Sequence, residues 1–349
     1  MSTKAPTLED IAREAGVSVA TVSRVLRGYP HIAAETRNRV MYAARSLRYK
    51  RAQTASQAKP SNGTAEGVVR KASGLKTLHV YMDLIAEKQF APIVLELIGI
   101  GAQRGFKTVV NTCNQEDLIN RAVAHEPEDN AAIAVITLRR VTEDDAERIR
   151  ESLVPVALVN RYVRGMTFSV TLDDYAAGCR AARYLFNLGH RRIACLQGDL
   201  KASSMVDRAA GFRAELLELG VYDASLFLET GGRSPGFHQR IAECMKKLLA
   251  EEDPVTAVWA WNDVAASAAI VAAHSMGVCT PEKLSVMGFD AVDEESTRIT
   301  SFQYSFRELA YCTVALLEMR LAGSLRQPIR ICVSPTFIEG DTTAPPPTK

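Results

Sequence analysis

The stretch TLEDIAREAGVSVATVSRVL, residues 7–26, predicts the structure of the amino-terminal end of the chain. Apolar residues recur at helical spacing in its first half, and Thr7 precedes them as a candidate N-cap. Gly16 is expected to end this helix, because glycine readily adopts a positive φ. Ser18 then caps a second helix whose apolar side faces the first one. Two helices joined by a short turn with a glycine predict a helix-turn-helix.

Some residues of the second helix cannot lie on its inward face. Val19 and Ala20 are apolar, yet the helical spacing leaves them outside, and we expect them to contact thymine methyl groups in a DNA major groove. Arg24 can reach a guanine from the same face, and the neighbouring hydroxyls are placed for phosphate oxygens. The alternative is a plain three-helix packing module with a solvated Arg24. The expected DNA-binding residues are Thr7, Ser18, Val19, Ala20, Thr21, Ser23, Arg24, Arg27 and Tyr49.

The charge distribution favours the DNA interpretation. Residues 1–60 contain eleven Lys and Arg residues against four acidic ones, whereas the rest of the chain has 31 basic and 36 acidic residues. A third amphipathic helix, expected from 34 to 47, carries arginines on its rim. A basic segment attached to a mildly acidic body indicates a polyanionic partner for that segment alone.

The body of the chain alternates short apolar runs with amphipathic stretches. Strands are expected at 78–82, 107–111, 132–138, 154–160, 168–173, 192–197, 256–261 and 284–289. Strands separated by helices predict parallel, doubly wound sheets, and these are too many for one compact sheet, so we expect two lobes. Open sheets of this kind bind ligands beyond the carboxyl ends of their strands. The polar residues expected at those ends are Asn111, Asn160, Asp173, Asn262, Asp263 and Asp290.

Residues 7–26, together with AAETRNRVMYAARSLRY at 33–49, resemble the DNA-binding head of the lactose/galactose-repressor (LacI/GalR) family of bacterial transcription regulators. Two stretches of the body, VTLDDYAAGCRAARYLFNLGHRRIACLQG at 170–198 and LSVMGFD at 284–290, resemble the effector-binding core of the same family. The resemblance implies an α/β protein with an N-terminal all-α helix-turn-helix head. It also implies a two-lobed core like that of periplasmic binding proteins, with Rossmann-like, doubly wound lobes.

The resemblance further implies an effector site and its ligand class. By position, the expected effector-binding residues are Phe90, Asn160, Ser204, Arg208, Asn262 and Asp290. Arginine and amide groups can donate hydrogen bonds to a sugar-like effector, while the Asp290 carboxylate can accept them. The alternatives are a structural ion pair between Arg208 and Asp290 and a helix cap at Asn262. The resemblance also implies a double-stranded DNA operator as a partner. It implies a homodimer built from both lobes, and a tetramer is left open.

Two stretches depart from the family pattern. Tyr49 is not followed by the family's proline, and residues 51–76 lack the leucine pattern of its hinge helix. A degenerate hinge and a disordered tether both fit this composition. The family's ligand-stacking aromatic is replaced by Gly231–Gly232, so Trp259 or Trp261 is a candidate for the apolar platform.

The expected organisation follows from these patterns. It is a helix-turn-helix domain at 1–50, a linker at 51–76, an effector-binding and dimerisation domain at 77–340 and a tail at 341–349. The first lobe is expected at about 77–162 and 296–324, and the second at about 163–295 and 325–340.

Other function classes lack the residues that they need. Seven cysteines without a CxxC pair or a matching histidine spacing indicate neither a disulfide framework nor a zinc site. We find no phosphate loop or cluster for catalysis, so we expect no enzyme, no metal and no cofactor. No signal peptide or membrane span is expected, which predicts a cytoplasmic protein. A repressor is the leading hypothesis; an activator or dual regulator of the same family, and a solute-binding protein without gene control, are the alternatives.

Overall fold

A computed structural model describes residues 7–26, 33–47, 76–83, 87–125, 130–232, 235–291 and 298–348 of the chain. The chain divides into two compact units, Met1–Ala72 and Ser73–Lys349. Each unit has a hydrophobic core of its own. Among the helices in the described ranges, none is both long enough and apolar enough to cross a bilayer.

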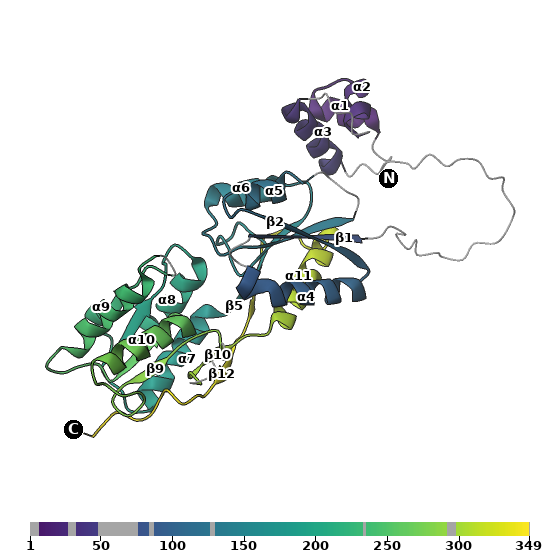
Figure 1. Ribbon diagram of the computed structural model, residues 1–349. Helices are drawn as coiled ribbons and strands as arrows, with labels where there is room; N and C mark the ends of the chain where they lie inside the picture. The colour runs from purple at the N-terminus through teal and green to yellow at the C-terminus, as the bar shows by residue number, and fades with distance from the viewer. Residues whose placement is uncertain are drawn as a thin grey trace. The chain divides into compact units, whose positions relative to one another are not determined.

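The described part of the first unit consists of three helices. They are α1 (Leu8–Ala15), α2 (Val19–Leu26) and α3 (Ala34–Ser46), coloured purple in Figure 1. Thr7 begins α1 with a capping box, since its hydroxyl accepts from the Asp10 backbone N–H and the Asp10 carboxylate accepts from the Thr7 N–H. Gly16 ends α1 in the left-handed region, at φ 62°. The expected helix-turn-helix is confirmed.

A small core holds these three helices together. Ile11, Val22 and Val40, one from each helix, are completely buried. Val19 lies at the start of α2 and is 40% exposed. The apolar residues of α2 are therefore divided between an inward face and an outward one.

The first lobe of the second unit is built on a six-stranded parallel sheet, in the order β11-β5-β4-β3-β1-β2. Its strands are β1 (Lys76–Asp83), β2 (Phe106–Cys113), β3 (Ala131–Ile136), β4 (Val156–Val159), β5 (Ser169–Leu172) and β11 (Arg330–Val333). Its helices are α4 (Glu87–Gln103), α5 (Leu118–Val123), α6 (Glu143–Glu151) and α11 (Phe306–Leu321). Helices α4 and α11 cover one face and α5 and α6 the other (Figure 1). The inner strands are buried on both faces, which explains their continuous apolar runs.

The second lobe has a four-stranded parallel sheet, in the order β7-β6-β8-β9. Its strands are β6 (Ile193–Gln197), β7 (Phe227–Glu229), β8 (Ala257–Ala260) and β9 (Ser285–Met287). Its helices are α7 (Asp174–Asn187), α8 (Ser203–Glu218), the short 3-10 helix η1 (Ala224–Leu226), α9 (Phe237–Leu249) and α10 (Asp263–Ser275). An antiparallel pair, β10 (Ser301–Gln303) and β12 (Thr336–Ile338), lies next to this sheet through the bridge from Met287 to Thr300. All eight expected strand positions hold a strand, and the two-lobed, doubly wound core is confirmed.

The chain crosses between the lobes at other places than the sequence suggests. Strand β5 (169–172) pairs with β4, and β11 (330–333) pairs with β5, so both strands belong to the first lobe. The prediction that placed these residues in the second lobe is wrong. Residues 301–303, expected in the first lobe, pair with β12 beside the second. Short apolar runs fit either sheet, so only the tertiary pairing decides which lobe receives them.

Candidate functional site

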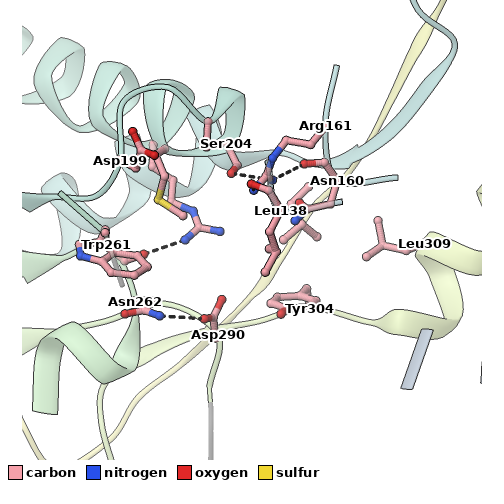
Figure 2. Close-up of a pocket in the computed structure, with 15 residues that line it drawn as sticks. Leu138, Asn160, Arg161, Asp199, Ser204, Trp261, Asn262, Asp290, Tyr304 and Leu309 are labelled. Carbon is pink, nitrogen blue, oxygen red and sulfur yellow. Dashed lines mark hydrogen bonds between the residues drawn. The ribbon is translucent and has the colours of Figure 1, made fainter. Parts of the chain in front are cut away.

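A cavity of about 200 Å³ lies where the two lobes meet, and Figure 2 shows the side chains around it. It is lined from the first lobe at the carboxyl ends of strands and from the second lobe along α8 and the start of α10. Five of the six expected effector residues line it: Asn160, Ser204, Arg208, Asn262 and Asp290. The sixth, Phe90, belongs to α4, and its side chain lies outside the described residues.

Asn160 follows β4 directly and has a left-handed backbone, with φ 63°. Its side chain is buried, and the described residues offer its Oδ1 atom no hydrogen-bond donor. A buried carbonyl oxygen without a donor is costly, typically by ~1–3 kcal/mol. Because Asn160 lines the cavity, a ligand hydroxyl or amine that reaches this oxygen would satisfy it.

Arg161 is a cavity residue that the sequence reasoning missed, although it stands directly after Asn160. It is only 3% exposed, and burial lowers the pKa of its guanidinium to about 10. Its Nη1 donates to the Asn160 carbonyl oxygen (2.6 Å) and to the Ser204 hydroxyl (3.2 Å), while Nη2 donates to the Leu138 carbonyl oxygen (2.8 Å). Because Ser204 lies on α8, Arg161 connects the two lobes at the edge of the cavity (Figure 2).

Arg208 is held by three groups behind the cavity wall. Its Nε donates to Asp174 Oδ1 (2.7 Å), its Nη1 donates to the Trp261 carbonyl oxygen (2.7 Å), and its guanidinium lies 3.4 Å from the centre of the Phe289 ring. Burial raises the pKa of the Asp174 carboxyl, and the charge of Arg208 opposes that rise. The alternative ion pair between Arg208 and Asp290 is wrong, because the carboxylate that pairs with Arg208 is Asp174.

Asn262 and Asp290 form the opposite wall. The Asn262 side chain accepts from the Ala265 N–H (2.9 Å), so the helix-cap alternative is confirmed for α10. The same side chain donates through Nδ2 to Asp290 Oδ2 at 3.5 Å. Asp290 has φ 112°, a strained value for a residue with a side chain, and this turns its carboxylate towards the cavity (Figure 2). One amide thus fixes both a helix start and a ligand-facing carboxylate.

The outer face of α2 carries the expected DNA-reading groups. Val19, Ala20 and Arg24 are exposed, and Arg24 makes no hydrogen bond or ion pair with any described residue. The Ser18 hydroxyl accepts from the Thr21 N–H (3.1 Å) and so serves as the cap of α2. Arg27 and Tyr49 lie outside the described residues.

Comparisons with known proteins point to one family for both units. Residues 7–52 match the profile of bacterial regulatory proteins of the lacI family, and residues 182–343 match that of a periplasmic binding protein-like domain. The HTH-type transcriptional regulator GalS of Salmonella typhimurium strain LT2 is 27% identical, over 97% of this chain and 96% of its own.

The chain carries a LacI-family helix-turn-helix domain and a periplasmic-binding-like domain.

Two solved structures have the same architecture. The transcriptional regulator CelR in complex with cellobiose aligns with a TM-score of 0.65 and 25% identity, over 97% of this chain and 99% of that one. The lac repressor dimer, bound to operator and the anti-inducer ONPF, aligns with a TM-score of 0.67 and 22% identity, over 98% and 100% of the two chains. With this head and this core, the chain is a DNA-binding transcriptional regulator with a ligand-binding effector domain.

The aromatic platform of the cavity stands directly after β8. Trp261 lines the cavity and donates its indole N–H to the Thr230 hydroxyl (3.1 Å), whereas Trp259 is buried in the core and stacks on Phe212 at 4.5 Å. Gly232 lines the cavity at φ 68° without a side chain. Of the two tryptophans, only Trp261 can contact a ligand.

Three other strand-end residues take no part in this cavity. Asp173 caps α7, Asp263 accepts a hydrogen bond from the Ser301 hydroxyl, and Asn111 lies within β2. Asn111 lies on the edge strand of the first sheet, and the Asp173 and Asp263 side chains already have hydrogen-bond donors in the α7 start and at Ser301. Across the described ranges, no group of three or more His, Cys, Asp or Glu side chains is arranged to hold a metal ion.

Proposed function

We propose that this regulator is a repressor that binds a pseudo-palindromic operator as a dimer, in the cytoplasm where the DNA lies. In this proposal a small, hydroxyl-rich effector, a sugar or a sugar derivative, occupies the cavity between the lobes and changes the affinity for the operator. The observation that carries the proposal is the convergence of Asn160, Ser204, Arg208, Asn262 and Asp290 on one cavity from both lobes.

The cavity chemistry fits a polyhydroxylated molecule. Asn160 Oδ1 and the Asp290 carboxylate are acceptors, and Nη2 of Arg208 is a donor that makes no hydrogen bond with any described residue. Sugar hydroxyls both donate and accept, so they can satisfy all three groups together. Trp261 supplies an apolar surface for the ring face. The CelR complex with cellobiose supports a carbohydrate ligand in this fold.

The size of the cavity limits the ligand. Drug-sized sites usually have volumes of roughly 300–1,000 Å³. At about 200 Å³, this cavity suits a molecule with one ring better than an oligosaccharide when the lobes are arranged as described. We therefore propose a single-ring effector.

Contact with both lobes supplies the means of regulation. A ligand held by Asn160 in the first lobe and by Ser204 and Arg208 in the second favours one arrangement of the lobes over others. If that arrangement changes the affinity for the operator, the operator must change the affinity for the ligand by the same factor, typically by ~1–3 kcal/mol. We propose this reciprocal coupling as the regulatory mechanism.

The DNA contacts are proposed for α2. Val19 and Ala20 would contact thymine methyl groups, and Arg24 would donate to guanine O6 and N7. Ser18, Thr21 and Ser23, with Thr7, Arg27 and Tyr49 around them, would contact the phosphate backbone. The exposure of Val19 and Arg24 supports this assignment, because an apolar side chain and a cation on one face match a base edge rather than a protein core.

An apolar stripe on α4 supports self-association. Leu95 is 71% exposed and Ile98 is 41% exposed on this helix, and their spacing of three residues places them on one side of it. Exposed apolar groups that lie together usually mark an interaction surface. We propose that α4 contributes to the dimer.

Tryptophan fluorescence of the full-length protein tests the effector proposal. We expect a saturable change with one member of a panel of monosaccharides, sugar phosphates and nucleosides. Trp261→Phe should remove the change and Trp259→Phe should keep it, because only Trp261 lines the cavity. The active compound should then shift operator binding in a gel-retardation assay. A compound that binds yet leaves operator affinity unaltered would count against the regulatory role.

Repression and activation are separated by a reporter assay. With the operator overlapping a promoter, we expect expression to rise when the gene for this protein is deleted. Lower expression in the deletion strain would instead identify an activator.

A further inference from the structure

A second cavity, of about 350 Å³, lies entirely within the first lobe. It is bounded by the end of α6, the amino ends of β4 and β5, the end of α11 and the loop that precedes β11. It shares no lining residue with the cavity between the lobes. The effector cavity uses residues that follow β4, such as Asn160, whereas this one uses residues that precede it, such as Val154. The two cavities therefore lie at opposite ends of the strands of one sheet.

Arginines dominate the charge of this second cavity. Arg150 comes from the last turn of α6, Arg320 from the last turn of α11, and Arg326 from the loop after it. Among the described residues that line the cavity, none is an aspartate or a glutamate. Three like charges around one hollow repel each other, and an anion between them would relieve this repulsion.

One of the three guanidiniums is fixed in place. Arg320 donates through Nη1 to the Leu325 carbonyl oxygen (3.0 Å), and its guanidinium lies 3.9 Å from the centre of the Phe168 ring. Arg150 and Arg326 are different, because neither makes a hydrogen bond or ion pair with any described residue. The cavity thus has one ordered cation and two that have no hydrogen-bond acceptor among the described residues.

We propose that this cavity binds a small organic phosphate, as a second ligand site that is separate from the effector cavity. The planar guanidinium donates two parallel hydrogen bonds to a phosphate, and several arginines together neutralise its double charge. The Gln327 amide adds a neutral donor at the same rim. The hollow is far larger than the roughly 30 Å³ that one water molecule occupies in the liquid, so it has room for an organic group beside the phosphate.

Isothermal titration calorimetry of the full-length protein tests this site with glucose 6-phosphate, inorganic phosphate and uncharged glucose. We expect saturable binding of glucose 6-phosphate that weakens as salt rises, because the arginines at the rim are exposed. The double variant Arg150→Ala/Arg326→Ala should weaken it at least about tenfold. Arg213→Ala, which removes an exposed arginine on α8 outside the cavity, is the matched control and should leave it unchanged.

A further variant separates the two cavities. Asp290→Ala alters the cavity between the lobes and should leave phosphate binding intact. The proposal is overturned if the double arginine variant binds glucose 6-phosphate as tightly as the wild-type protein does. It is also overturned if binding is lost in Asp290→Ala alone, since the phosphate would then occupy the effector cavity, or if neither phosphate binds saturably.

Discussion

The two functional surfaces of this regulator are built in opposite ways. On α2, Val19, Ala20 and Arg24 stand on consecutive turns, are exposed, and take almost no part in the fold. In the effector cavity, Arg161 and Arg208 are buried; Arg161 has partners in both lobes, and Arg208 has its partners in the second lobe. A change on α2 should therefore alter binding alone. A change in the cavity should alter both binding and the free energy of unfolding.

The largest effect is expected for Asp174→Ala. Removing this carboxylate leaves the buried Arg208 without its counter-ion, and breaking a buried pair from one side typically costs ~3–5 kcal/mol. Urea unfolding followed by tryptophan fluorescence measures this loss, since both tryptophans lie in the second lobe.

The double variant Asp174→Ala/Arg208→Met is the matched control for that prediction. It removes both charges together, so it should be more stable than Asp174→Ala alone. Equal stability of the single and double variants would show that the charge of Arg208 is not what makes the loss of Asp174 costly.

Asp290→Ala should weaken effector binding by about tenfold or more, because a charge-assisted hydrogen bond is worth ~1.5–3 kcal/mol. The affinity for the operator without effector should not change. The measurements are a fluorescence titration and a gel-retardation assay. Asp341→Ala, at an exposed acidic residue of the second unit, should leave both unaltered. A normal response to effector in Asp290→Ala would remove this residue from the site.

Local structure could be predicted from the sequence wherever neighbouring residues determine it. The helix-turn-helix could be predicted directly, because its features depend on contacts within a few residues. These features are the capping box at Thr7, the left-handed Gly16 and the helical spacing of α2. Eight strands could be predicted as well from their apolar runs, whereas the short strands β7, β10, β11 and β12 were not predicted. Their distribution between two sheets could not, since β5 and β11 join the first lobe through pairing with distant segments.

The effector cavity shows the same limit. Asn160 and Asn262 could be proposed from their positions at strand ends, and Arg208 from the family resemblance. Arg161 could not, because its role depends on carbonyl and hydroxyl groups that the fold brings together from residues 138, 160 and 204. The partner of Arg208 was equally hidden, since Asp174 is 34 positions away along the chain.

Arg24→Ala tests the exposed face of α2. We expect a loss of ~1–3 kcal/mol in operator binding at one base-pair position, with relaxed specificity there and an unchanged free energy of unfolding. Binding to an operator library measures the specificity. Arg39→Ala, at an exposed residue of α3, serves as the control for charge alone. Equal weakening on all sequences would make Arg24 a phosphate contact.

The smallest effect is expected at a cluster near the cavity in which Arg330 is partly exposed. Asp207 on α8 accepts from the Tyr162 hydroxyl (2.9 Å) and pairs with Arg330 of the first lobe (2.8 Å), so this cluster joins the lobes one residue away from Arg208. The Arg330 side chain is 25% exposed, and solvent weakens such a pair to about 1 kcal/mol or less.

Arg330→Met should remove that ion pair and make the lobe arrangement with a complete cavity less favourable. The expected result is up to about fivefold weaker effector binding, as 1 kcal/mol converts to this factor. Arg298→Met breaks an ion pair within the second lobe whose side chains are 64% and 69% exposed. This control variant should leave effector binding unchanged. If Arg330→Met matches this control, the cluster contributes nothing to lobe closure. Coupling between lobes would then depend on the bridge from Arg161 to Ser204 and on the ligand itself.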